Sequence, residues 1–151
     1  HLVKQMGARY IDGRTKTPKE MVETCCTAGN LDIIFEASGA ATTAAELINH
    51  MSRSSIYVMT GIPSLGVTLQ VDAGQLVGQI VRFKQVVVGS VNSNRSHFEM
   101  ALGDMLDINS NFSGLLEDMF THRFRLENYD KAFTLNGPGH IKTVIEVEPW
   151  S

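Results

Sequence analysis

The sequence predicts an open α/β fold, with a mostly parallel sheet and helices on both of its faces. Strand-length stretches rich in apolar and β-branched residues alternate along the chain with stretches of helical spacing. The chain has 151 residues, of which 43% are hydrophobic and 19% are charged. That length and composition are typical of one globular domain, so we expect residues 1–151 to form a single domain.

The chain begins with a pattern typical of the second half of a helix. Apolar residues recur at helical spacing over residues 2–6, and Gly7 stands where a helix would end. The next five residues, 8–12, have a short strand pattern, so we expect a strand there.

A second helix is predicted from its capping residues. Thr17 is a favourable N-cap, Pro18 suits the first helical position, and Glu20 completes a capping box with Thr17. We expect this helix to run to Ala28 and to end at Gly29.

The middle of the chain predicts three strands of a parallel sheet. The stretch 31–37 is almost continuously apolar and β-branched, so we expect a strand buried on both faces. Residues 55–61 and 85–91 have the same character. Helices are expected between the strands, over 41–51 and from Asp72 to residue 83, where Asp72 is the N-cap.

The last third of the chain predicts helices and one strand. Ser96 and Glu99 have capping-box spacing, so we expect a helix from there to residue 108, followed by a turn-rich break over 109–114. Short helices at 114–120 and 129–135 and a final strand at 141–147 complete the expected elements.

Small and polar residues stand where each of the three central strands ends. In parallel sheets ligands bind beyond the carboxyl ends of the strands, and small residues let a ligand approach the backbone closely. The alternative is that these residues merely end their strands, and a single strand end would favour that alternative. Three consecutive ends favour a ligand. The candidates are Ser38 and Gly39; Thr60, Gly61 and Ile62; and Ser90, Val91 and Asn92.

Charge and cysteine content narrow the class of protein. The net charge is −3 and no basic stripe is present, which argues against a nucleic-acid partner. No apolar run approaches the ~20 residues that span a bilayer, and the first residues lack a secretory-signal pattern. Cys25 and Cys26 are adjacent and have no histidine near them at zinc-ligand spacing, so we expect two reduced thiols, no metal site and a cytoplasmic protein.

Several stretches, taken in order, resemble the cofactor domain of medium-chain, zinc-type alcohol dehydrogenases. They are KQMGARYIDGR, LDIIFEASG, SSIYVMTGI, NYDKAF and IKTVIEV. More narrowly, VVVGSVNSNRSHFEMA and GHIKTVIEV resemble the glucose dehydrogenase branch of that family. The resemblance covers essentially the whole chain and implies a partial Rossmann-like domain of the glucose dehydrogenase C-terminal type, lacking its first two strands.

The resemblance also implies which functional parts are absent. The Gly-rich G-x-G-x-x-G turn, the residue that reads the ribose 2′ position and every zinc ligand would precede this chain. The sequence therefore does not decide between NAD and NADP, and it assigns zinc only to the missing catalytic domain. No catalytic residue is expected within residues 1–151.

In the family, the loops after the fourth, fifth and sixth strands line the nicotinamide end of the cofactor. The resemblance therefore assigns the eight candidate residues above to cofactor binding. In the glucose dehydrogenases the Asn of the matching Val-Asn pair also reaches the sugar, so Asn92 is the candidate for substrate contact. An amide donates and accepts hydrogen bonds, which suits a sugar hydroxyl. The alternative is that Asn92 only stabilises its turn.

The expected function is the NAD(P)-binding part of a glucose dehydrogenase, which transfers hydride from sugar C1 to NAD(P)+, with the isolated chain inactive. The partners implied are a sugar, a nucleotide and a second copy of the chain in a homo-oligomer. Two alternatives remain open: a truncated, non-catalytic interaction module with this fold, and another open-sheet enzyme such as a methyltransferase. Glu36, within the first central strand, is either a base or a side chain facing a helix dipole or solvent.

Overall fold

A computed structural model describes residues 1–26 and 31–148. The chain divides into two compact units. One comprises Tyr10–Asn92, and the other combines His1–Arg9 with the described residues from Ser93 onward. No helix among the described residues is long and apolar enough to cross a membrane.

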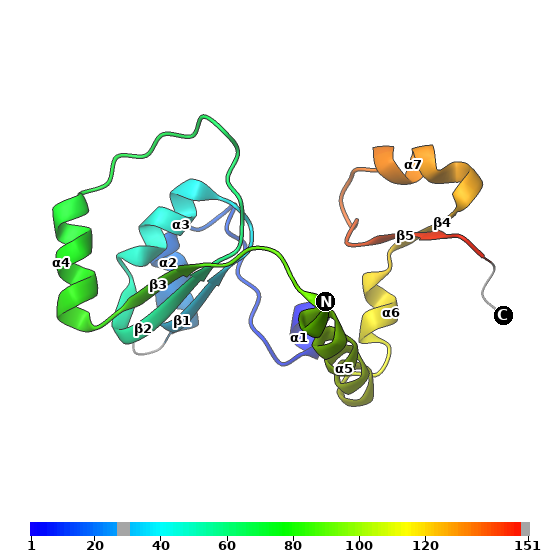
Figure 1. Ribbon diagram of the computed structural model, residues 1–151, viewed down its shortest axis with the longest axis horizontal. Helices are drawn as coiled ribbons and strands as arrows, with labels where there is room; N and C mark the ends of the chain where they lie inside the picture. The colour runs from blue at the N-terminus through cyan, green and yellow to red at the C-terminus, as the bar shows by residue number, and fades with distance from the viewer. Residues whose placement is uncertain (27–30, 149–151) are drawn as a thin grey trace. The chain divides into compact units, whose positions relative to one another are not determined.

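The unit Tyr10–Asn92 is built on a three-stranded parallel sheet (Figure 1). Its strands are β1 (Leu31–Glu36), β2 (Met51–Met59) and β3 (Val86–Gly89), and they lie in that order. Both pairings are parallel. The predicted α/β class and parallel sheet are therefore confirmed.

Helices precede and connect these strands. They are α2 (Pro18–Cys25), α3 (Ala41–Ile48) and α4 (Ala73–Phe83). The predicted capping box is confirmed, since the Thr17 hydroxyl accepts from the Glu20 N–H at 3.3 Å and the Glu20 carboxylate accepts from the Thr17 N–H at 2.8 Å. Asp72 also caps α4, accepting from the Gln75 N–H at 2.9 Å. The helix predicted to run to residue 28 ends earlier, at Cys25, where Cys26 is in extended backbone. The predicted stop at Gly29 lies outside the described residues.

The core of this unit lies between the sheet and α3. Ile34, Met51 and Tyr57 form a buried cluster, against which Leu47 and Ile48 of α3 pack. The Tyr57 ring is fully buried, and its hydroxyl donates to the carbonyl of Ala44 in α3 at 2.9 Å. That hydrogen bond fixes α3 on the sheet without leaving a buried donor unpaired.

A buried amide joins α4 to the start of β2. The Gln85 side chain donates to the carbonyls of Met51 and Ser52 at 3.1 and 3.0 Å, and its oxygen accepts from Gln79 of α4 at 3.2 Å. Gln79 also donates to the Ile48 carbonyl at the end of α3. These bonds give hydrogen-bond partners to carbonyl groups at the end of α3 and at the start of β2.

The other face of the sheet is exposed, contrary to the expectation that β1 is buried on both faces. Side chains alternate between the faces of a strand, and β1 buries Ile34 while Ile33 and Phe35 are 71% and 66% exposed. Val86 and Val88 of β3 are half exposed in the same manner. The apolar run predicts burial correctly for one face, because only that face meets α3.

Two further boundary predictions are wrong. Residues 8–12 form no strand, because a strand needs a hydrogen-bonded neighbour and the described residues supply none there. The helix expected over 41–51 ends at Ile48, and β2 begins at Met51 rather than at residue 55. The pairing register shifts between Leu31 and Ile33, so β2 is irregular before Ile56 and the predicted strand corresponds to its regular part.

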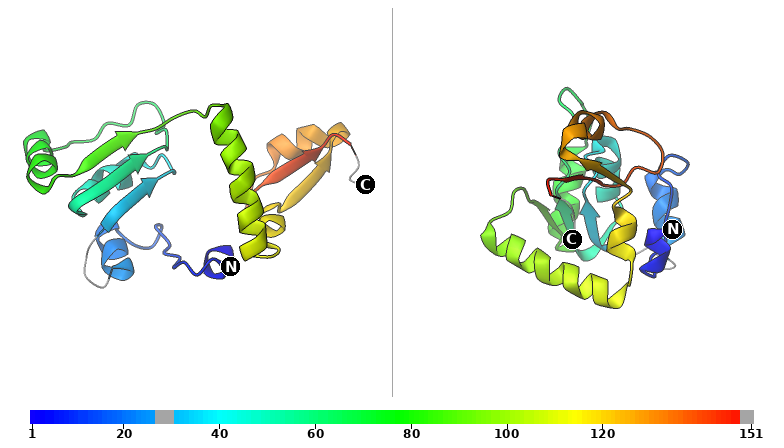
Figure 2. Two further views of the ribbon diagram at one scale, coloured as in Figure 1. Left: turned by 60° about the horizontal axis from the view of Figure 1, so that its bottom comes forward. Right: turned by 90° about the vertical axis from the view of Figure 1, so that its right-hand side faces the viewer.

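The second unit contains a small parallel sheet of its own. Strands β4 (His122–Arg125) and β5 (Thr143–Glu146) pair in parallel, with α7 (Tyr129–Thr134) between them in the chain (Figure 2). Strand β5 and α7 confirm their predictions, but β4 was not predicted. The remaining elements of this unit are α1 (Leu2–Gln5), α5 (Arg95–Asn111), α6 (Leu115–Met119) and a 3₁₀ turn η1 (Leu126–Asn128).

The start of α5 differs from its prediction. Its N-cap is Asn94, whose side chain accepts from the His97 N–H at 3.1 Å, while His97 Nδ1 accepts from the Asn94 N–H at 3.2 Å. Ser96 and Glu99 therefore lie inside the helix, where Glu99 pairs with Arg95 at 2.7 Å. The helix also continues through the first half of the expected break at 109–114 and ends at Asn111.

Candidate functional site

The carboxyl ends of β1, β2 and β3 meet at one edge of the sheet. Glu36 pairs with Met59, and Met59 pairs with Gly89, so the three strands end level with one another. The eight predicted site residues follow directly after these three positions. The structure therefore places all three predicted loops along the same edge, within the unit Tyr10–Asn92.

A buried carboxylate organises the first loop. Glu36, the last residue of β1, is only 7% exposed. Its Oε1 accepts from the Ser38 N–H at 2.7 Å, from the Ser38 hydroxyl at 2.6 Å and from the Gly39 N–H at 2.8 Å. The chain consequently turns around the carboxylate as it leaves the strand.

The backbone of Glu36 also holds the second loop. Its carbonyl accepts from the Thr60 N–H at 2.8 Å, from the Thr60 hydroxyl at 3.1 Å and from the Gly61 N–H at 3.1 Å. One residue at the end of β1 therefore accepts hydrogen bonds from two neighbouring loops. This arrangement joins the loops after β1 and β2 into one structure.

The surroundings of Glu36 favour its charged form. The hydrogen bond from the Ser38 hydroxyl lowers the pKa of Glu36 below its ordinary value, and the N–H groups of Ser38, Gly39 and Gly61 act in the same direction. Burial opposes them by raising that pKa, and the net direction is downward. Glu36 is therefore a carboxylate at neutral pH, placed to accept hydrogen bonds.

Two glycines allow the first two loops to touch. Gly39 has φ +69°, and a Cβ there would lie 2.7 Å from the carbonyl oxygen of Ile62. A Cβ on Gly61 would meet the amide nitrogen of Gly39 and would lie 2.6 Å from the Glu36 carboxylate. Neither position has room for a side chain, so glycine is required by close approach at both.

The third loop, which follows β3, is joined to β2 by a backbone hydrogen bond. The Ser90 N–H donates to the Met59 carbonyl at 2.9 Å, which continues the pairing of β3 with β2. Asn92 has φ +67°, a left-handed conformation that asparagine adopts more readily than most residues. Ser90, Val91 and Asn92 are all exposed, so their side chains are accessible to a ligand.

The predicted site residues therefore divide into two groups. The hydroxyls of Ser38 and Thr60 are engaged with Glu36, and the two glycines provide the contact between loops. These four residues hold the loops together, although Ser38 is itself exposed. The other group comprises Ile62, which is 79% exposed, together with the exposed Ser90, Val91 and Asn92.

The role of Glu36 differs from the roles that its position in the sequence suggested. It faces neither a helix dipole nor solvent, because its carboxylate is buried in the loop that follows it. An acidic residue at the end of an apolar strand, directly before Ala-Ser-Gly, is the signal in the sequence. The contribution of Gly61 comes from a loop 25 residues further on, which no local pattern indicates.

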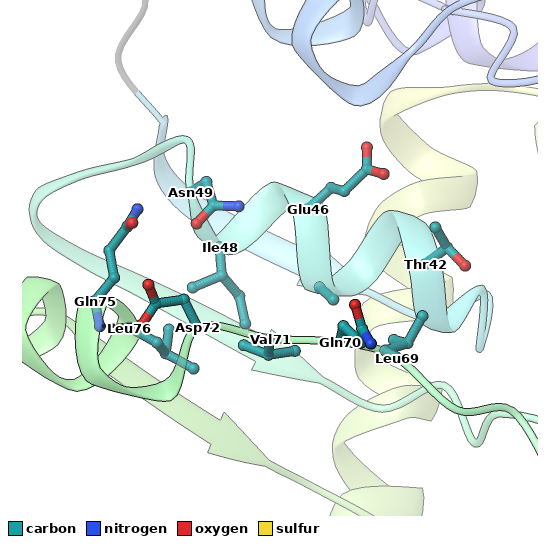
Figure 3. Close-up of a pocket in the computed structure, with 11 residues that line it drawn as sticks. Thr42, Glu46, Ile48, Asn49, Leu69, Gln70, Val71, Asp72, Gln75 and Leu76 are labelled. Atoms are coloured by element: carbon teal, nitrogen blue, oxygen red, sulfur yellow. Dashed lines mark hydrogen bonds between the residues drawn. The ribbon is translucent and has the colours of Figure 1, made fainter.

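A hollow of about 370 Å³ lies elsewhere in the same unit, between α3 and the segment that leads into α4 (Figure 3). Ile48 points from α3 toward Val71, while Glu46 points away from that segment (Figure 3). None of the eight predicted site residues lines this hollow. Within residues 1–26 and 31–148, no three His, Cys, Asp or Glu side chains gather as a metal site.

Comparison with known proteins places these features in a family. The model of the family described as "Glucose dehydrogenase C-terminus" matches residues 1–147. Glucose 1-dehydrogenase 2 of Vulcanisaeta moutnovskia is 32% identical over 146 residues, which are 97% of this chain and 39% of that protein. Glucose 1-dehydrogenase of Haloarcula marismortui is 31% identical over 147 residues, with the same two coverages. The chain thus spans about two fifths of the length of these relatives.

Solved structures agree with the sequence relatives. Haloferax mediterranei glucose dehydrogenase, solved in complex with NADP, Zn and gluconolactone, matches with a TM-score of 0.83 at 26% identity, over 98% of this chain and 39% of that one. Thermotoga maritima alcohol dehydrogenase matches with a TM-score of 0.68 at 22% identity, which shows a shared fold. The predicted Rossmann-like fold is confirmed, and the chain belongs to the family of glucose dehydrogenase C-terminal domains.

Proposed function

We propose that this chain is the nucleotide-binding part of a sugar dehydrogenase that transfers hydride from C1 of a sugar such as glucose to NAD+ or NADP+. The observation that carries the proposal is the pair of loops joined by Glu36 at the carboxyl edge of a parallel sheet. This edge is where open α/β sheets bind ligands. The relatives named glucose 1-dehydrogenase, and the Haloferax structure solved with NADP, support the same assignment.

The accessible residues of the edge suit a nicotinamide ring. Ile62 and Val91 offer exposed apolar side chains for the faces of a flat ring. Asn92 and Ser90 offer polar groups for its carboxamide or for a sugar hydroxyl. When bound, the nicotinamide supplies a carbon that accepts hydride, and the task of this chain is to hold the ring in one orientation.

We assign the zinc ion to a part of the longer protein outside residues 1–151. Zinc in proteins takes three or four His, Cys, Asp or Glu ligands, and the described residues offer no such group. The residues present therefore do not fit a zinc centre, and no catalytic step is assigned to them. On this proposal the isolated chain does not oxidise sugar.

The sheet also suggests self-association. Both β1 and β3 are edge strands, and the exposed sheet face carries Ile33, Phe35, Val86 and Val88. Unpaired edges and apolar sheet faces are surfaces that proteins cover. We place a second copy of the chain there in a homo-oligomer, joined through β3.

The first prediction tests nucleotide binding on the isolated chain. Nicotinamide mononucleotide should bind weakly, at about millimolar Kd, because the contacts assigned to this chain are to the nicotinamide ring alone. The amide NMR signals of Gly39, Gly61 and Asn92 should shift on its addition. Adenosine monophosphate, which lacks the nicotinamide ring, is the matched control and should leave these amide signals unchanged. Equal shifts with both nucleotides, or shifts confined to other parts of the chain, would contradict the proposal and favour a non-catalytic module.

The second prediction concerns Glu36. Glu36→Gln should lower the free energy of unfolding at neutral pH by about 2 kcal/mol, because charge-assisted hydrogen bonds are lost and the new NH₂ group faces N–H donors. The pKa of Glu36 is lowered in the folded state, so its contribution is present above the ordinary carboxyl range and disappears as the pH falls through the folded-state pKa. Urea unfolding of the two proteins should therefore converge in acid.

Glu23→Gln is the control for that experiment. Glu23 is 63% exposed and lies 3.9 Å from Lys19, so its substitution should change the free energy of unfolding by less than about 0.5 kcal/mol. If both variants have the same small effect, the Glu36 carboxylate does not hold the loops together.

The third prediction concerns Asn92 in the longer protein to which the proposal assigns this chain. Asn92→Ala should raise KM for the sugar about tenfold, which corresponds to about 1.4 kcal/mol of lost hydrogen bonding. The nucleotide Kd should stay nearly constant. The Asn92→Gly variant separates side chain from backbone, since glycine keeps φ +67° without strain. Full sugar affinity in Asn92→Gly would assign Asn92 to the turn alone.

The fourth prediction tests self-association by light scattering. The purified chain should scatter as a species larger than its monomer mass of 16.6 kDa. Val88→Lys, at a half-exposed position of β3, should shift the population toward monomer, because a charge on the contact surface is costly to bury. A monodisperse monomer at high concentration in both proteins would refute the homo-oligomer.

A further inference from the structure

The two cysteines lie at the point where α2 ends. Cys25 is the last residue of the helix, and Cys26 is its C-cap, with φ −119° and ψ 106°. Adjacent side chains on a continuous helix point about 100° apart and do not face each other. The change to extended backbone at Cys26 redirects its side chain, and the two sulfur atoms lie 3.2 Å apart.

This sulfur pair is partly exposed and forms no disulfide. Cys25 is exposed, Cys26 is half-buried, and neither forms a disulfide. An internal disulfide is disfavoured by the backbone, because neighbouring Cα atoms are about 3.8 Å apart whereas ordinary disulfides join Cα atoms about 4.4–6.8 Å apart. The pair therefore persists as two thiols that point to the same place.

The two thiols lie 3.2 Å apart, within hydrogen-bonding distance of each other, so both can bind one atom. A tetrahedral zinc ion with Zn–S bonds of about 2.3 Å separates two sulfur ligands by about 3.8 Å. Zinc also needs further protein ligands, which the described residues do not gather here. A separation of 3.2 Å instead suits a pyramidal centre with a narrower angle between its bonds, of which trivalent arsenic is the thiol-binding example.

We propose that Cys25 and Cys26 form a dithiol site that chelates trivalent arsenic. With phenylarsine oxide, two S–H bonds and the As–O bond break, two As–S bonds form and one water leaves. Arsenic stays trivalent throughout, so no oxidant or reductant is needed. The site belongs to α2 and is separate from the loops at the carboxyl edge of the sheet.

The test uses the reduced chain of residues 1–151 and phenylarsine oxide. Intact-mass measurement should show one arsenical per chain, with both thiols lost to a thiol reagent. The adduct should survive excess 2-mercaptoethanol and be released by dithiothreitol. Chelation by two thiols should increase its retention by about 10²-fold or more over a single thiol. Cys25→Ser and Cys26→Ser should each lose the adduct to 2-mercaptoethanol.

A third variant keeps two thiols but separates them. Glu23→Cys combined with Cys26→Ser places the sulfurs on residues 23 and 25, both within α2, where side chains two residues apart do not face each other. It should behave like the single variants. Retention equal to that of the parent chain, two arsenicals per parent chain, or an adduct that joins two chains would each overturn the proposal.

Discussion

The carboxyl edge of the sheet depends on how the charge of Glu36 is satisfied. Burying a carboxylate is costly unless its oxygens accept hydrogen bonds. Here the donors to the carboxylate come from the loop that follows β1, and the backbone carbonyl of Glu36 accepts hydrogen bonds from the loop that follows β2. The loops can supply these groups only because Gly39 and Gly61 let their backbones touch. The charge, the two glycines and the position of the loops are therefore one structural requirement.

The hydrogen bonds to Glu36 give polar residues at the strand ends a structural role. Ser38 and Thr60 look like ligand-binding groups in the sequence, yet their hydroxyls bind Glu36. Elsewhere on this edge the exposed side chains include the apolar Ile62 and Val91, together with Asn92. The residues bonded to Glu36 therefore fix the geometry of the edge, whereas Ile62, Val91 and Asn92 are exposed on it.

The features predicted correctly from the sequence are those that depend on residues close together in the chain. Thr17 and Glu20 cap each other within one turn, and the central strands follow from their apolar runs. Features that depend on distant partners were missed, such as the absence of pairing at residues 8–12 and the exposure of Phe35. The cap at Asn94 was missed for another reason, because His97 takes the part that Glu or Gln has in the usual capping box.

The second sheet has a consequence for how the chain unfolds. β4 pairs only with β5, and β1, β2 and β3 pair only among themselves, so among the described residues no strand ladder joins the two units. The two-stranded sheet depends on α7, which packs on both of its strands, whereas β2 is paired on both sides. Amide hydrogens in β4 and β5 would then exchange through local openings more readily than those of β2. Hydrogen exchange followed strand by strand would report these different opening free energies within one chain.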